Sequence, residues 1–254
     1  SSLDDKIELN NRINSELENL AKTIYDYWFV QFDFPDENGT PYKSSGGKMV
    51  YNQERKREIP AGWEVKKLRQ FASTASGGTP LSTKKEYYEN GSIAWINSGE
   101  LNNRYITEAK NFITQSGLNN SSAKLFEPNT LLIAMYGATA GKVSLLQINA
   151  CTNQAICAII PNSDIHTKFL KFATDDLYNF LINLSTGSAR DNLSQDLIRE
   201  LSFALPQENL LIKFNQMVNP MITKILNNHL QNQQLTQLRD WLLPMLMNGQ
   251  ITVK

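Results

Sequence analysis

The sequence predicts an α+β protein in which a mixed α/β globular domain is carried on a stalk of two long antiparallel helices. Two observations predict this fold class. A heptad-like seam near the start returns near the end with every member offset by 218 positions, as from Leu3 to Met221. Between the two copies, short apolar runs alternate with Gly and Asn clusters, a pattern typical of strands and turns. A helix repeated on both sides of one insert suggests two helices that pair as a coiled coil.

The repeated seam has apolar residues at helical spacing and two polar interruptions at equivalent places. Its first copy is Leu3, Ile7, Asn10, Asn14, Leu17, Leu20 and Ile24, and its second is Met221, Ile225, Asn228, Asn232, Leu235, Leu238 and Leu242. If Phe32 enters the domain level with Leu210, the numbers of antiparallel partners add up to 242. The expected apolar partners are Ile7 with Leu235, Leu17 with Ile225, Leu20 with Ile222 and Ile24 with Val218.

The same register places Asn10 opposite Asn232 and Asn14 opposite Asn228. Asn in an apolar seam costs stability unless a polar group faces it, so a paired layer would fix the register of the stalk. The alternative is that these side chains point to solvent.

The elements follow in chain order. Residues 1–34 hold the first stalk helix, expected from about Leu3 to Phe32, and residues 35–58 are a turn-rich connection. The globular domain covers 59–206, with strands expected in one mixed sheet and a helix over about 168–184. The expected strands are Ile93–Ile96, Leu131–Met135, Val143–Leu146, Ala155–Ile160 and Leu201–Leu205. The second stalk helix lies in 207–254, kinks at Pro220 and ends near Met247.

Composition limits the classes of protein. The 254 residues are 41% hydrophobic, enough for one core and an accessory element. No run approaches the roughly 20 apolar residues of a membrane span, and Ser1–Asp5 does not resemble a signal peptide, so we expect a cytoplasmic protein. A zinc site needs about four ligands, whereas the two histidines stand isolated in sequence. Cys151 and Cys157 are therefore expected to be buried free thiols on one face of a strand, with no metal or cofactor.

Charge is unevenly distributed along a chain whose net charge is zero. Residues 1–34 contain three Lys and Arg against seven Asp and Glu, whereas residues 43–85 contain ten against three. Zero net charge argues against a stand-alone nucleic-acid binder, but a basic block of this size can concentrate phosphate. A plain solvated surface explains the block equally well.

The motifs that suggest catalysis fail on inspection. Gly137–Val143 looks like a phosphate loop, but Tyr136 occupies the position of the first Gly and Val143 that of the metal-binding hydroxyl, so we predict a tight turn between strands. Pro35-Asp36 with Glu64-Val65-Lys66 could form a Mg²⁺ nuclease, although Asp36 lies in a polar turn. Two histidines give no credible catalytic triad. The sequence offers binding features rather than chemistry.

Several segments in family order then resemble the specificity subunit of type I restriction-modification systems, over about its second half. They are Leu17–Phe32, Ile59–Leu68, Ser76–Pro80, Ile93–Leu101, Ala134–Val143, Thr152–Ala155 and Leu235–Pro244. None is diagnostic alone, but together they cover nearly the whole chain.

The resemblance implies two target recognition domains, each reading half of a bipartite DNA site, separated by conserved helices. This chain has one such domain, at 59–206, so it is similar to a fragment, a split-gene product or a half-subunit that forms a homodimer. The implied partners are double-stranded DNA, modification (methyltransferase) subunits and a restriction subunit. Methyl transfer and cleavage would reside in those subunits, so we expect no catalytic residues here. An interaction module without DNA readout and the metal nuclease are the alternatives.

Loops of the domain supply the candidate DNA contacts, because phosphate and base contacts need cations, hydroxyls and amides that can enter a groove. The candidates are Ser76, Thr79, Lys84, Lys85, Tyr87, Ser98, Asn103, Arg104, Tyr136, Lys142, Thr186, Ser188 and Arg190. Lys84 and Lys85 are expected to contact phosphate and Arg104 to contact guanine. Each also has a plainer explanation as a packing, turn or ion-pairing residue.

Overall fold

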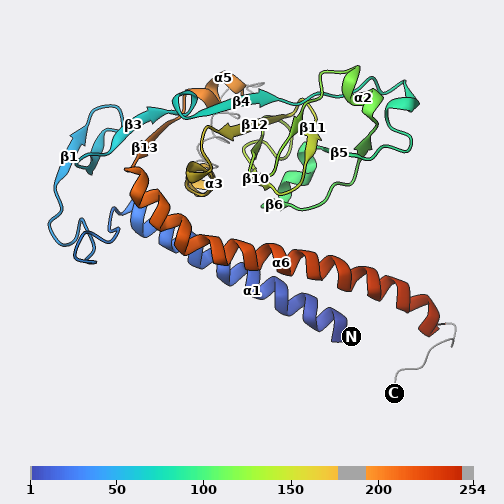
Figure 1. Cartoon of the computed structure of the whole chain (residues 1–254), viewed down its shortest axis with the longest axis horizontal. Helices are drawn as coiled ribbons and strands as arrows, with labels where there is room; N and C mark the ends of the chain where they lie inside the picture. The colour runs from blue at the N-terminus through green and yellow to red at the C-terminus, as the bar shows by residue number, and fades with distance from the viewer. Residues whose placement is uncertain (1, 177–192, 248–254) are drawn as a thin grey trace.

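A computed structural model describes residues 2–176 and 193–247 of the chain. Two long helices, α1 (Ser2–Tyr25) and α6 (Glu208–Met247), lie side by side and antiparallel along one side of a mixed α/β domain (Figure 1). The expected fold class is confirmed. The first helix is shorter than expected, because α1 passes into a π-helical turn, η1 (Asp26–Val30), and Phe32 adopts a left-handed φ of 68° that ends the helix.

The domain is built on two main sheets instead of the single mixed sheet expected. One has the order β4-β12-β9-β10-β6 and the other β7-β5-β11-β8. Their strands are β4 (Ala72–Ser76), β5 (Ile93–Ile96), β6 (Tyr105–Ile106), β7 (Phe112–Ile113), β8 (Leu125–Phe126), β9 (Leu131–Ala134), β10 (Val143–Leu146), β11 (Ala150–Thr152) and β12 (Ile156–Pro161). The pairs β10–β6 and β11–β5 are parallel and the others antiparallel, so both sheets are mixed.

The five-stranded sheet is covered on both faces. Along β9, Leu131 and Ile133 belong to the apolar cluster that includes the stalk, whereas Leu132 and Ala134 belong to a second cluster between the sheets. Alternate residues of a strand point to opposite faces, which explains why β9 reads as a continuous apolar run. The expected strand positions at β5, β9, β10 and β12 are confirmed to within a residue.

The cysteines correct one expectation. Cys151 lies in β11 and Cys157 in β12, so they occupy two strands of different sheets instead of one face of one strand. Both are free and buried, as expected. Burial raises the pKa of the Cys151 thiol to about 11 and that of Cys157 to about 12, so both thiols stay protonated near neutral pH.

Two further two-stranded sheets flank the main pair. β3 (Glu64–Lys67) pairs with β13 (Ser202–Leu205), close to the strand expected at 201–205. β1 (Met49–Asn52) pairs with β2 (Arg57–Pro60), which corrects the expectation that 35–58 is a connection without strands. The two strands have only four residues each and flank a polar turn, so their residue pattern does not stand out in the sequence. Short helices complete the domain: η2 (Leu68–Gln70), η3 (Lys85–Tyr87), η4 (Ser98–Asn102), α2 (Gln115–Asn119), η5 (Asp164–His166), α3 (Thr167–Asp176) and α5 (Gln195–Arg199).

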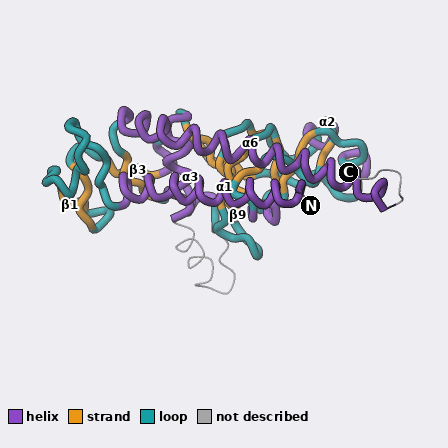
Figure 2. The backbone as a smooth tube through the Cα atoms, turned by 90° about the horizontal axis from the view of Figure 1, so that it is seen from below, coloured by secondary structure: helices purple, strands orange, loops and turns teal. Residues whose placement is uncertain are grey.

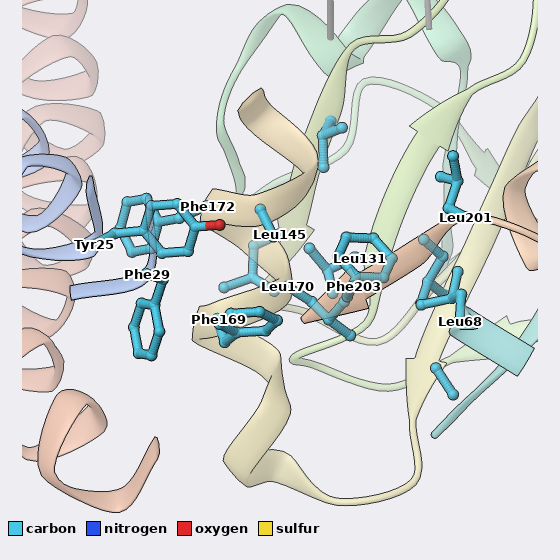
Figure 3. Packing of buried hydrophobic residues seen from close by; sticks show 14 of the residues in the cluster. Tyr25, Phe29, Leu68, Leu131, Leu145, Phe169, Leu170, Phe172, Leu201 and Phe203 are labelled. Atoms are coloured by element: carbon cyan, nitrogen blue, oxygen red, sulfur yellow. The ribbon is translucent and has the colours of Figure 1, made fainter. Parts of the chain in front are cut away.

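An aromatic cluster joins the stalk to the domain. Tyr25 of α1 stacks on Phe172 of α3 with ring centroids 5.7 Å apart, and Phe29 of η1 meets Phe169 edge to face at 5.1 Å. Phe214 of α6 lies 4.9 Å from Phe29. Figure 3 shows the rings of Tyr25, Phe29, Phe169 and Phe172 continuing into the apolar residues of the sheet, so stalk and domain share one core. Aromatic pairs in this geometry contribute about 0.5–1.5 kcal/mol each beyond the area they bury.

The stalk has the register expected from the sequence. Asn10 donates from Nδ2 to Asn232 Oδ1 at 2.8 Å, and Asn228 donates to Asn14 Oδ1 at 2.8 Å. Asn11 accepts a third hydrogen bond, from Asn232, at 2.8 Å. Asn10, Asn14 and Asn228 are buried, so the amides form a layer between the helices instead of pointing to solvent. Within the described residues, Asn10 Oδ1 and Asn14 Nδ2 are buried without a partner.

Two members of the expected seam lie outside it. Leu20 is 48% exposed and Leu238 is 42% exposed, whereas Ala21 is 1% exposed. The buried positions of α1 continue the alternating spacing of four and three from Leu17 to Ala21, so Leu20 falls on the outer face and cannot meet Ile222 as expected. Leu20 is more apolar than Ala21, but the position of a residue around the helix determines whether it is buried. α6 continues through Pro220 and curves along its length (Figure 1).

Candidate functional site

Loops from both main sheets converge at one edge of the domain. The pairing of Cys157 with Ser76, Ile156 with Ala134 and Ile96 with Thr152 places the ends of β4, β9, β5 and β11 beside the start of β12. Chain segments that are far apart in sequence therefore meet at this edge.

Polar side chains form a continuous chain across these loops, which we call the loop face and define as Thr79, Asn97, Asn102, Lys142, Asn153 and Gln154. Thr79 Oγ1 donates to Gln154, Asn153 Nδ2 donates to Asn97 Oδ1 at 3.2 Å, and Lys142 Nζ donates to Asn102. The turn η4 links Asn97 to Asn102. The structure thus brings together Thr79 and Lys142 of the predicted residues.

Backbone geometry holds the loop face in place. Gly78 donates its amide to Thr152 O at 2.8 Å, and Asn153 donates its amide to Ile96 O at 3.0 Å. A Cβ added at Gly77 would lie 2.1 Å from Thr152 Oγ1, and one at Gly78 would lie 2.3 Å from Ser122 Oγ. These two positions require glycine because the backbones approach so closely. The Gly77-Gly78 pair therefore has a structural role at the loop face.

The loop face is rich in amides and poor in charge. Lys142 is its single cation, and the other five members carry amide or hydroxyl groups, which can donate and accept hydrogen bonds. Amides in such a set match the hydrogen-bonding edges of bases, because Asn and Gln can pair bidentately with adenine. They can also donate to phosphate, but they carry no charge that would attract it.

The connection between β9 and β10 is a tight turn, as expected. Val143 pairs with Ile133 in an antiparallel register, and Gly137 and Gly141 adopt φ values of 82° and 80°. Tyr136 is half-buried and packs against the main apolar cluster. It therefore lies beside the loop face with its ring partly held in the core.

The other predicted residues are less free than expected. Ser76 donates to Gln195 Oε1 at 2.8 Å, and the amide of Gln195 in turn binds Thr74, so Ser76 belongs to an internal network. Tyr87 is 5% exposed and lies in the core, which corrects its placement among surface residues; Gly117 packs on its backbone. Ser98 is half-buried at the start of η4 and Asn103 is exposed just after it. Thr186, Ser188 and Arg190 lie outside the described residues.

Lys84 and Lys85 are exposed at the start of η3, and neither belongs to the hydrogen-bonded set of the loop face. Lys84 donates from Nζ to the phenol oxygen of Tyr87 at 3.0 Å, and this bond raises the pKa of Lys84. Lys84 Nζ also lies 3.9 Å from Glu86, a loose surface pair. Both lysines are thus accessible at the surface.

Arg104 faces the stalk instead of the loop face. Its Nε lies 3.6 Å from Glu18 Oε2 of α1, across a cleft of about 680 Å³ between the domain and the stalk. His229 of α6 lines the same cleft, and burial lowers its pKa although Glu18 raises it in part. Gln233 donates to Thr107 Oγ1 at 3.2 Å and ties the domain to α6 here. Arg104 therefore makes an ion pair with the stalk, the plainer role considered for an arginine.

Sequence reasoning missed Asn153 and Gln154. Both lie in the Thr152–Ala155 segment that carries part of the family resemblance, and that segment was the available signal.

Among the described residues, no three His, Cys, Asp or Glu side chains gather to hold a metal ion. Asp36 accepts hydrogen bonds from Thr40 and Asn38, and Glu64 pairs with Lys66 at 2.7 Å. In the part of the chain that the structure describes, no helix has an apolar stretch long enough to cross a membrane.

A two-helix stalk that shares its core with a mixed α/β domain, together with a polar loop face, defines a recognition module. The chain belongs to the family of the type I restriction modification DNA specificity domain, whose model matches residues 60–239.

Relatives and solved structures agree with this assignment. The HindI specificity subunit of Haemophilus influenzae is 27% identical over 98% of this chain and 65% of its own length. The MjaIX specificity subunit of Methanocaldococcus jannaschii is 28% identical over 100% of the chain and 57% of its own length. The S subunit from M. genitalium has a similar fold, with a TM-score of 0.66 at 17% identity over 96% of this chain and 57% of that one. The HsdS subunit from Thermoanaerobacter tengcongensis has a TM-score of 0.51 at 13% identity, over 98% of this chain and 55% of that one. The chain thus spans about 57–65% of the length of these two curated relatives.

Proposed function

We propose that this chain is a sequence-specific DNA-binding module that reads one half of a bipartite site through the loop face. The convergence of amide and hydroxyl side chains from three loops carries the proposal, because base edges are read by groups that donate and accept together. The family and the printed names of the relatives, which are specificity subunits of type I restriction enzymes, support it. Within this proposal the chain is not itself an enzyme.

Gln154 and Asn102 are the residues best placed to test the readout, since both are exposed members of the loop face. Gln154→Ala or Asn102→Ala should weaken binding to the recognised sequence by about 1–3 kcal/mol and relax the preference at one base position. The measurement is methylation-site mapping of the complex with its modification subunits, with binding titrations on duplexes altered one base pair at a time. An equal loss on every sequence would mean that these amides only position the backbone.

Lys84 and Lys85 provide the contrasting case of phosphate contact. Lys84→Ala with Lys85→Ala should weaken binding to all sequences and lower the salt slope by up to about two contacts, at roughly 0.9 per contact. A loss confined to one sequence would contradict this assignment. We propose Arg104 as a positioning residue instead of a guanine reader, since it pairs with Glu18; Arg104→Ala should leave the base preference unchanged.

The stalk is the proposed docking surface for modification subunits, which in turn would recruit a restriction subunit. Exposed apolar residues near the end of α6 support a role in association: Trp241 is 60% exposed and Leu243 is 47% exposed, just beyond the ion pair of Arg239 with Asp4. A homodimer of such chains would use the same surface. Light scattering of the wild type and of Trp241→Asp tests this, since a dimer through α6 should dissociate in the variant. The cytoplasmic location stays a prediction.

A further inference from the structure

Four of the ten cations at residues 43–85 form ion pairs in the structure. Lys66 pairs with Glu64, Lys67 and Arg69 both pair with Glu200, and Lys84 lies 3.9 Å from Glu86. Of the cations that remain outside η3, all but Lys43 lie on the hairpin formed by β1 and β2, at its start, in its turn and at the first residue of β2. They are Lys48, Arg55, Lys56 and Arg57, and all four are exposed. The amide-rich loop face has one cation, so the hairpin holds more cations than the loop face.

Among the described residues, no ion pair within 4 Å holds any of these four cations, although Glu54 and Glu58 lie in the same hairpin. Arg55 donates from Nη1 to Ser202 O at 2.7 Å, and Arg57 donates from Nη2 to Val30 O at 2.9 Å, so each guanidinium makes a hydrogen bond to a neutral carbonyl and keeps further donors. Arg57 also lies over the ring of Phe32, 4.6 Å from its centroid. Burial and the charge of Arg55 lower the pKa of Arg57, as expected where two like charges stand together.

The turn of the hairpin presents a lysine in a conformation that costs energy. Lys56 has a φ of 49°, in the left-handed region that favours glycine, and its side chain has no hydrogen-bond or ion-pair partner among the described residues. Asn52 Oδ1 accepts the amide of Arg55 at 2.9 Å and fixes the turn. The turn therefore holds the Lys56 side chain at an exposed position.

The hairpin is placed to act together with the loops of the domain. In Figure 2, β1 lies at one end of the molecule, beyond the two stalk helices, whereas β9 lies beside their middle. The loop that contains Lys142 joins β9 to β10, so a polyanion that contacts both this loop and the hairpin must lie lengthwise on the domain. Duplex DNA carries one negative charge per roughly 1.7 Å of its axis and so supplies phosphates at both places.

We propose that the β1–β2 hairpin binds the phosphate backbone of duplex DNA outside the base pairs that the loop face reads. This inference rests on the proposed function. Exposed guanidinium and ammonium groups that are not held in ion pairs are the donors that phosphate takes, and they carry no sequence information. The hairpin therefore adds affinity and salt dependence, and the loop face adds discrimination.

The test is the double variant Lys48→Ala/Lys56→Gly in the full chain assembled with its modification subunits. Glycine adopts the φ of residue 56 without strain, so the variant should fold as well as the wild type. Fluorescence anisotropy over 50–200 mM NaCl gives affinity and salt slope on a duplex with the recognised sequence and on one without it. The loss of two phosphate contacts should lower the salt slope by about 1.8. At 0.15 M salt, the affinity should fall roughly 5-fold if one contact is lost and roughly 30-fold if two are lost.

The expected result is an equal loss on both duplexes with an unchanged ratio between them. The matched control is Lys6→Ala/Lys224→Ala, which removes the same charge from exposed positions on the stalk. Because the stalk is also the proposed docking surface, its salt slope is measured per assembled complex, and that slope should equal the wild-type value. A variant that keeps the wild-type slope overturns the hairpin's role alone. Loss of assembly with the modification subunits, with DNA affinity per assembled complex unchanged, would assign the hairpin to an acidic protein surface and overturn the proposal. A wild-type complex that binds neither duplex overturns the proposed function itself.

Discussion

Asn14 and Asn228 share a hydrogen bond, so substitutions at these two positions should have strongly non-additive effects on the free energy of unfolding. Asn228 is 2% exposed, Asn14 is 6% exposed, and the donor and acceptor are 2.8 Å apart. Asn14→Ala or Asn228→Ala alone removes the bond and leaves the other amide buried without that partner, which costs about 1–3 kcal/mol. The double variant leaves neither amide behind, so it should cost less than the sum of the single variants by about 1–2 kcal/mol.

Urea unfolding followed by far-ultraviolet circular dichroism measures this cycle. The comparison is the cycle of Asn10 with Asn232, where Asn232 is half-buried and Asn10 also donates to Gln231 at 2.8 Å. Water and the neighbouring amide can replace a lost partner there, so that coupling should be about 0.5 kcal/mol or less. Single and double variants of Asn14 and Asn228 that add within about 0.5 kcal/mol would refute the idea that the two amides depend on each other.

Three further predictions concern the stalk, a histidine and the thiols. Leu20→Ala should change the free energy of unfolding by less than about 0.5 kcal/mol, whereas Ala21→Leu should cost about 1–3 kcal/mol by overpacking; equal effects in thermal unfolding would contradict the helix phase. Because burial lowers the pKa of His229, the folded state binds fewer protons than the unfolded state, so stability should fall as pH drops below 6.5 and less so in His229→Gln. Cys151 and Cys157 should not react with a thiol reagent at pH 8 until urea unfolds the chain; rapid native reaction would show exposure.

The stalk could be predicted from the sequence because its signal is local and repeated. Period and offset in the two seams were enough to pair Asn10 with Asn232 and Asn14 with Asn228. The error at Leu20 has the same origin, since a spacing of three or of four both continue a helical stripe. Hydrophobicity favoured Leu20, and only the packing of α1 against the domain shows that Ala21 is the buried residue.

The loop face could be predicted only in part, because it depends on contacts between residues far apart in the chain. Nothing local to Thr79 indicates that it meets Gln154, and nothing near Asn97 indicates Asn153. The parallel pairing of β5 with β11 creates these neighbours across more than fifty residues. Tyr87 shows the opposite failure, since an aromatic residue in a polar, lysine-containing segment looked like a surface contact but is buried.

The shared aromatic core has a consequence for where this protein can be divided. The family model begins at residue 60, after α1 and η1, yet Tyr25 and Phe29 from those elements complete the packing around Phe169, Phe172 and Phe214. A segment excised at the limits of the family match would expose one wall of its own interior to water. The matched segment is therefore smaller than the unit that shares this core, and a chimera that exchanges this domain should carry the aromatic end of the first helix along.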